Sequence, residues 1–138
     1  KTRHSPKRII VMTFKTKTNS VIIIFDVSYT EDFEIIQKYI VDEEIPFIDS
    51  LNQGNLVRFE WYFSPDEKTA TLVEMAKDSD AWEALATKVI GSPVNMKFND
   101  YFVIEKLTVL GEASESLREA IGPMNPVFKS YVAGFDIS

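Results

Sequence analysis

Cysteine is absent from the 138 residues of this chain, and histidine occurs once, as His4. Without cysteine the chain forms no disulfide and has no thiolate nucleophile, a composition that fits the cytoplasm. No core histidine is available to ligate haem or to act as a general base, and no His/Cys/carboxylate spacing typical of zinc is present. We therefore expect no metal and no cofactor.

Long apolar runs, a glycine-rich phosphate loop and a G-x-S-x-G motif are also missing. No run approaches the roughly 20 apolar residues that cross a bilayer, and the apolar run at residues 9–12 is too short for the core of a signal peptide. These absences predict a soluble chain without membrane contact and without P-loop or serine-hydrolase chemistry.

Acidic charge dominates, with a formal net charge of −6, but the first 20 residues contain basic residues and no acid. Such an arm either contacts phosphate groups, or it is a frayed terminus or a segment that docks on an acidic surface of its own or a neighbouring chain. Because no concentrated basic face is visible, we favour the second interpretation and expect no nucleic-acid partner. Residues 8–14 within this arm have the composition of an edge strand.

The rest of the chain has the composition of one folded domain. Hydrophobic residues make up 45% of the sequence and charged residues 26%, which indicates a sizeable core and argues against global disorder. We therefore divide the chain into a basic arm, residues 1–20, and a single domain, residues 21–138.

Four segments have strand patterns. Residues 21–27 (VIIIFDV) are almost continuously apolar, as in a central strand covered on both faces, with Asp26 as the exception. Residues 55–63 (NLVRFEWYF) alternate, and place Trp61 on a wholly apolar face. The turn SPDEK then predicts that residues 69–76 pair back as an antiparallel hairpin. Residues 101–110 (YFVIEKLTVL) form the fourth strand.

Helical spacing occurs between these strands. The first helix starts after Ser28 or Thr30, extends to about residue 51, and is kinked or interrupted near residues 43–45 because Pro46 cannot continue a regular helix. A second helix, capped by Asp78 or Ser79, ends before Gly91. Residues 93–100 are expected to form a loop, and residues 115–121 a short helix before a C-terminal extension.

The order strand, helix, strand, strand, helix, strand predicts an α+β, ferredoxin-like βαββαβ domain with an antiparallel sheet. Both main helices then cover one face of the sheet. The other face would expose an apolar patch too large for a monomer, so we expect a homodimer packed sheet to sheet, with Trp61 at an inward position.

Three segments resemble the antibiotic biosynthesis monooxygenase-like group of dimeric α+β barrels: FEWYFSPDEKTATLVEMAKDSDAWEAL, YFVIEKLTVLG and VFKSYVAGF. The resemblance covers residues 21–135. It implies a ferredoxin-like protomer, a dimeric α+β barrel, and a cavity between sheet and helices in each protomer.

Oxygenases and haem degraders of this group tend to carry a polar residue on the first strand, a tryptophan ending the hairpin's second strand, and a histidine on the next helix. By resemblance, Asp26 stands at the first place, Ala76 at the second, and Leu85 or Ala86 at the third. Two of the three polar functions are therefore missing, and haem degradation is not expected.

Asp26 and Tyr62 are the candidate catalytic residues, and a larger set is the candidate ligand pocket: Asp26, Trp61, Tyr62, Glu74, Trp82, Asn95 and Phe102. A carboxylate buried in an apolar strand can act as a base, but such a residue more often caps a neighbouring helix or pairs with a basic side chain. Glu74 can likewise pair across the sheet. The aromatic residues fit a flat apolar ligand, and they also fit a core or a dimer interface.

Two functions of different class follow from these residues. The first is a dimeric module that binds a small apolar or aromatic ligand without catalysis, which the missing tryptophan and histidine favour. The alternative is a cofactor-independent monooxygenase that oxidises an aromatic substrate of the quinol or anthrone type.

Overall fold

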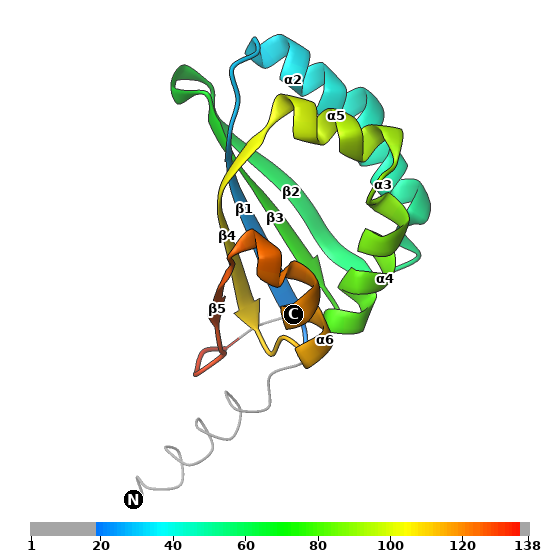
Figure 1. Ribbon diagram of the computed structural model, residues 1–138, viewed down its shortest axis with the longest axis vertical. Helices are drawn as coiled ribbons and strands as arrows, with labels where there is room; N and C mark the ends of the chain where they lie inside the picture. The colour runs from blue at the N-terminus through cyan, green and yellow to red at the C-terminus, as the bar shows by residue number, and fades with distance from the viewer. Residues whose placement is uncertain (1–18, 136–138) are drawn as a thin grey trace, which may run out of the picture.

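The computed structural model describes residues 19–135, so the basic arm with its expected edge strand at residues 8–14 and His4 lies almost wholly outside the described residues. Within them the chain forms an open five-stranded sheet in the order β2-β3-β1-β4-β5 (Figure 1). The strands are β1 (Val21–Ser28), β2 (Leu56–Ser64), β3 (Thr69–Ala76), β4 (Val103–Gly111) and β5 (Val127–Lys129).

The first four strands pair as the sequence predicted. β1 lies in the middle and pairs antiparallel with β3 and β4, while β2 pairs antiparallel with β3. This is the ferredoxin-like arrangement, so the predicted α+β fold class is confirmed. The C-terminal extension adds β5, which runs parallel to β4 and widens the sheet at that edge.

The helices pack on one face of the sheet, and the opposite face carries none of them (Figure 1). They are α2 (Phe33–Tyr39), a π-helical segment η1 (Ile40–Glu44), α3 (Ile45–Asn52), α4 (Ser79–Val89), α5 (Pro93–Tyr101) and α6 (Glu115–Ile121). No helix within residues 19–135 has the length and apolar character needed to cross a membrane.

The first helical stretch changes geometry where the sequence predicted an interruption. In η1 the Ile45 amide donates to the Ile40 carbonyl, five residues back instead of four. Pro46 follows in the first turn of α3, where its missing N–H costs little. The stretch begins with Asp32 as N-cap, so the expected start at Ser28 or Thr30 was too early.

The prediction of a loop at residues 93–100 is wrong, because this segment forms helix α5. The Ser92 hydroxyl accepts a hydrogen bond of 3.2 Å from the Asn95 amide, and Pro93 occupies the first turn. Proline after glycine was interpreted only as the end of α4, although proline is also favoured at the first position of a helix. Strand β4 consequently begins at Val103 rather than at residue 101.

The two faces of the sheet differ in burial. Along β1, Val21, Ile23, Phe25 and Val27 are buried under the helices, while the alternate side chains are only partly buried. The expectation that β1 is covered on both faces is therefore wrong for the single chain. Trp61 also lies on the helix side, where it stacks on Phe102 with ring centroids 5.0 Å apart, and not on the helix-free face.

Candidate functional site

A cavity of about 180 Å³ lies between the helix-covered face of the sheet and the surrounding helices. Most of its wall is apolar, formed by side chains that include Phe25, Ile48, Leu56, Phe59, Leu72, Leu85, Ala86, Val89, Ile104 and Leu107. Pockets for drug-sized ligands measure roughly 300–1,000 Å³. The space therefore suits a smaller organic molecule.

Five polar side chains interrupt this apolar wall: Tyr39, Glu44, Glu74, Asn95 and Asn99. Lysine, arginine and histidine do not occur among the described residues that line it. The polar chemistry of the cavity is therefore that of two carboxyl groups, two amides and a phenol.

Glu44, the last residue of η1, points one carboxyl oxygen at the indole of Trp61. Trp61 Nε1 donates to Glu44 Oε1 over 2.7 Å, and only 5% of Glu44 is exposed. Burial raises the pKa of Glu44 to about 8, which the Trp61 hydrogen bond partly offsets and the negative charge of Glu74 increases.

Glu74 reaches the same cavity from β3. Trp82 Nε1 on α4 donates to Glu74 Oε1, also over 2.7 Å. Burial raises the pKa of Glu74 to about 7, against the opposing effect of the Trp82 hydrogen bond. Two carboxyl groups from different elements are thus held in the same way, each by one indole N–H.

One oxygen of each carboxyl group has no hydrogen-bond donor within the part of the chain that the structure describes. The Oε2 atoms of Glu44 and Glu74 accept no hydrogen bond from any described residue. Because both residues border the cavity, these oxygens are placed to contact whatever occupies it.

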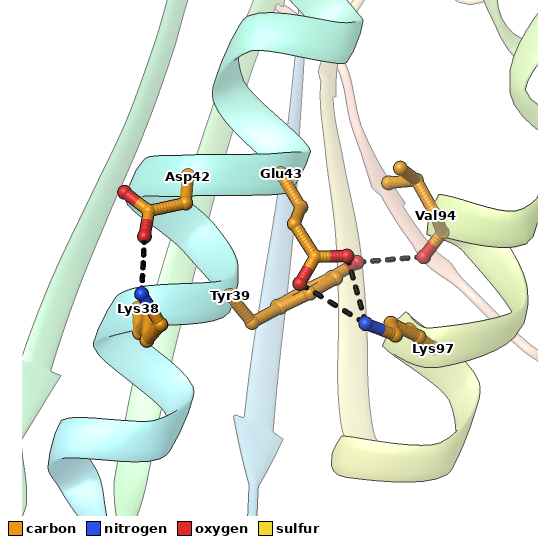
Figure 2. Close-up of polar contacts among 6 residues, drawn as sticks. All are labelled: Lys38, Tyr39, Asp42, Glu43, Val94 and Lys97. Carbon is orange, nitrogen blue, oxygen red and sulfur yellow. Dashed lines mark hydrogen bonds and ion pairs between the residues drawn. The ribbon is translucent and has the colours of Figure 1, made fainter.

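Helix α5 forms one wall of the cavity and is fastened to the first helical stretch (Figure 2). The Tyr39 hydroxyl donates to the Val94 carbonyl over 2.7 Å, and Lys97 Nζ lies 2.8 and 3.0 Å from the two oxygens of Glu43. These contacts fix the position of Asn95 and Asn99, which both face the cavity.

The residues predicted as a pocket separate into two groups. Glu74, Trp82 and Asn95 line the cavity, and Trp61 and Phe102 form an aromatic stack beside it. A second pocket, of about 340 Å³ and more open to solvent, is lined by residues that include Asp26 and Tyr62.

Asp26 and Tyr62 have local partners on the helix-free face. Asp26 accepts a hydrogen bond of 2.7 Å from the Thr71 hydroxyl, and the Tyr62 hydroxyl donates a hydrogen bond of 2.9 Å to the Glu60 carboxylate. With 55% of its surface exposed, Tyr62 is on the opposite side of the sheet from the cavity. A catalytic role for either residue stays a prediction, and it would have to operate outside the cavity.

Sequence reasoning missed Tyr39, Glu44 and Asn99. Glu44 left a detectable signal, because it is four residues from Ile40 and four from Ile48, and so interrupts an apolar helical stripe with a charge. Asn99 left none, since the segment that carries it was interpreted as a loop. No cluster of three or more metal-binding side chains occurs in residues 19–135.

Comparison with known proteins gives similarity at the level of structure only. No family model and no curated protein matches the sequence. MupZ from Pseudomonas fluorescens superimposes with a TM-score of 0.73 at 15% identity, over 87% of this chain and 96% of MupZ. SnoaB from Streptomyces nogalater, described as a cofactor-independent oxygenase, superimposes with a TM-score of 0.58 at 10% identity, over 70% of this chain and 96% of SnoaB.

At these identities the likeness concerns the fold. The strand order, the single helix layer and the extent of both superpositions agree with the resemblance found in the sequence. The chain therefore has a ferredoxin-like fold, which it shares with MupZ and SnoaB.

Proposed function

We propose that this domain binds a small, mostly apolar organic molecule in the cavity between sheet and helices. The observation that carries the proposal is an apolar space of about 180 Å³ bordered by two carboxyl groups with free oxygens. Apolar surface supplies the binding free energy in such a site, and a few polar groups set the orientation of the ligand.

The lining also restricts the ligand's charge. Phosphorylated or carboxylated molecules are disfavoured, because the described lining contains Glu44 and Glu74 but no cation. A neutral molecule with one or more hydrogen-bonding groups matches the carboxyl groups and the amides of Asn95 and Asn99.

Ligand binding is testable through the two tryptophans of the chain, Trp61 and Trp82, which both bond carboxyl groups at the cavity. Neutral bicyclic probes such as 2-naphthol should quench or shift their fluorescence saturably. Ala86→Phe, which fills the cavity from α4, should abolish this response. Ala84→Phe places the same side chain on the exposed side of α4 and should leave it intact. Equal binding by both variants would overturn the proposal.

A cofactor-independent monooxygenase is the second candidate. It is favoured by the fold shared with SnoaB and by Glu74, whose position in an apolar cavity suits a base that deprotonates an aromatic substrate before oxygen reacts. The absence of tryptophan at Ala76 and of histidine at Leu85 or Ala86 argues against it. Oxygen consumption with anthrones or quinols, lost in Glu74→Gln, would support this activity, and no consumption by a protein that binds these compounds would exclude it.

We also propose that two copies associate through the helix-free face of the sheet. Neighbouring strands place aliphatic side chains there that a single chain leaves partly exposed: Ile22, Ile24, Val73, Met75 and Leu110. A second sheet laid on this face would bury them.

We further propose a location in the cytoplasm, which is consistent with the lack of cysteine.

A further inference from the structure

We propose that Glu44 and Glu74 are a general acid and a general base that act together on a neutral, apolar ketone, moving a proton to or from the carbon next to its carbonyl group. The inference rests on the proposed binding function and adds to it a reaction and a substrate class. It assigns to this chain a catalytic pair that does not depend on Asp26 or Tyr62.

The geometry of the pair carries the argument. Glu44 comes from the π-helical segment and Glu74 from the sheet, yet both border one apolar cavity. Each is oriented by a single indole N–H at 2.7 Å and keeps its other oxygen free. Burying carboxyl groups in an apolar space lowers stability unless each is fully bonded. The arrangement leaves both half-bonded, as expected of groups that complete their hydrogen bonds with a substrate.

The electrostatics give the two carboxyl groups different protonation states near neutral pH. The pKa of Glu74 is raised to about 7 and that of Glu44 to about 8, and the charge of ionised Glu74 contributes to the higher value. The pair therefore releases one proton near neutral pH and holds the second to higher pH, and in this proposal the first is assigned to Glu74.

Other titratable groups nearby do not change this order. The pKa of Tyr39 is raised by burial and by the charges of Glu44 and Glu43, so its phenol stays neutral. Tyr101 packs on Tyr39 with ring centroids 5.2 Å apart, and Glu43 is paired with Lys97. Around neutral pH the cavity thus presents one hydrogen-bond donor acid and one carboxylate base.

A neutral acid beside a carboxylate in an apolar site suits proton abstraction next to a carbonyl. Glu74 takes the proton from carbon, and the C–H electron pair becomes the carbon–carbon double bond of an enol. The carbonyl π pair moves to oxygen, which receives the proton of Glu44. Protonated Glu74 then returns a proton to the same or a conjugated carbon while Glu44 takes back the proton of the enol oxygen, so that a ketone and both carboxyl groups are regenerated and no oxidant or reductant is consumed.

Competing reaction classes fit the lining less well. Phosphoryl transfer needs positive charge around the phosphate, whereas the described lining has no cationic side chain and residues 19–135 contain no cluster of three or more side chains that could hold a metal ion. Glycoside hydrolysis also uses two carboxyl groups, but a sugar needs partners for several hydroxyl groups, and this wall is mostly aliphatic and aromatic.

Hydrogen–deuterium exchange of 2-tetralone tests the proposal. The compound is a neutral bicyclic ketone with acidic C–H groups, and loss of its α-proton signal in deuterated buffer is followed by proton NMR under argon. The protein should accelerate exchange by roughly 100-fold or more over an equal concentration of free glutamate. Glu74→Gln should lose roughly 100-fold and Glu44→Gln at least about 10-fold. The exposed Glu119→Gln should behave as wild type.

The dependence on pH is a second readout, which loss of a merely structural role would not produce. The exchange rate should rise as Glu74 ionises and fall as Glu44 loses its proton, giving a bell-shaped profile. Circular dichroism of each variant shows whether it has folded, and tryptophan fluorescence shows whether 2-tetralone is bound.

Each other result overturns part of the argument. Saturable binding of 2-tetralone without accelerated exchange would exclude the acid–base pair and leave ligand binding in place. Exchange that persists in a folded Glu44→Gln, Glu74→Gln double variant would place the chemistry elsewhere. No fluorescence response to 2-tetralone, with a response to 2-naphthol, would exclude apolar ketones alone, whereas no response to either would remove the binding function as well.

Discussion

Glu44 and Glu74 illustrate at the residue scale what a cavity does to a carboxyl group. On the surface, water would solvate both oxygens, whereas here one indole N–H serves one oxygen of each. Because desolvation disfavours the charged form, the folded chain holds these two protons to a higher pH than the unfolded chain does. Protonation of two residues is thereby coupled to folding.

This coupling predicts that the stability of the protein falls with rising pH. The folded-state pKa values, about 8 and about 7, exceed the ordinary value of 4.5, so the native state binds more protons than the unfolded state between these limits. The contribution of both groups is complete below about pH 4.5 and is lost as the pH rises through about 7 and 8. Glu44→Gln, which keeps the volume and an acceptor for Trp61, should be more stable than wild type by on the order of 1–3 kcal/mol at about pH 8.5 and nearly unchanged at about pH 4.

Urea denaturation at the two pH values measures this difference. Glu119→Gln is the control, because its side chain is exposed and it tests the loss of one acidic charge alone. A Glu44→Gln variant with the same pH dependence of stability as wild type would show that Glu44 is hydrated in solution.

The indole donors give a second prediction at this scale. Trp61→Phe removes the hydrogen bond that lowers the pKa of Glu44, so that pKa should rise further, and Trp82→Phe should raise the pKa of Glu74 in the same way. Carbon-13 NMR titration of glutamate side chains measures both values. Each substitution serves as the control for the other, since each indole bonds a different carboxyl group. A pKa that does not move, or that falls, would contradict the assigned hydrogen bond.

Helix α5 and the π-helical segment decide the site at the scale of elements. The wide turn of η1 ends at Glu44, directly before the proline-containing first turn of α3, and so brings a charged side chain toward the sheet. Such π-helical segments are rare in proteins, and those that occur are often found at functional sites. Helix α5 packs beside η1 and supplies Val94, Asn95, Phe98 and Asn99 to the cavity wall.

The contacts of Figure 2 should differ in strength. Tyr39 is 1% exposed and its hydroxyl bonds the Val94 carbonyl, so Tyr39→Phe should lower the free energy of unfolding by about 0.5–1.5 kcal/mol. It should also speed amide hydrogen exchange in α5. Lys97→Ala breaks an ion pair whose side chains are 49% and 41% exposed, and should change stability by less than about 0.5 kcal/mol. A larger loss in Lys97→Ala than in Tyr39→Phe would mean that the ion pair, and not the phenol, fastens the helix.

The whole molecule has one face covered by helices and one face without them. The covered face holds the cavity, and the helix-free face carries partly exposed aliphatic side chains beside polar ones such as Asp26 and Tyr62. Ligand binding and self-association would therefore use opposite faces of the same sheet, and one can be disrupted without the other.

Association is tested by light scattering, which should give twice the protomer mass at micromolar concentration. Ile24→Lys puts a charge in the middle of the helix-free face and should yield monomers that still fold and bind probes in the cavity. Val41→Lys makes a comparable change at a side chain that is 56% exposed on the helical layer, and should remain dimeric. A wild-type protein that is monomeric throughout would rule out the sheet-to-sheet dimer.

Elements with a strong hydrophobic period or a clear cap follow from the order of residues alone. The alternation around Trp61, the apolar run of β1, the cap at Asp78 and the disruption by Pro46 depend on local stereochemistry, so they could be predicted from neighbouring residues. The ferredoxin-like order followed from them. Helix α5 could not be assigned with equal ease, because serine, proline and glycine favour both the end of one helix and the start of the next.

Which residues share a site depends on how the helices pack on the sheet. Asp26 and Tyr62 appeared equivalent to Glu74 along their strands, but side chains that alternate along a strand project to opposite faces, and only the packing of helices makes one face a cavity. The partnership of Glu44 with Glu74 joins residues thirty positions apart. The pKa of each is raised only where the sheet, α4 and the π-helical segment together remove most of the water around the two carboxyl groups, and that desolvation is a property of the assembled layers.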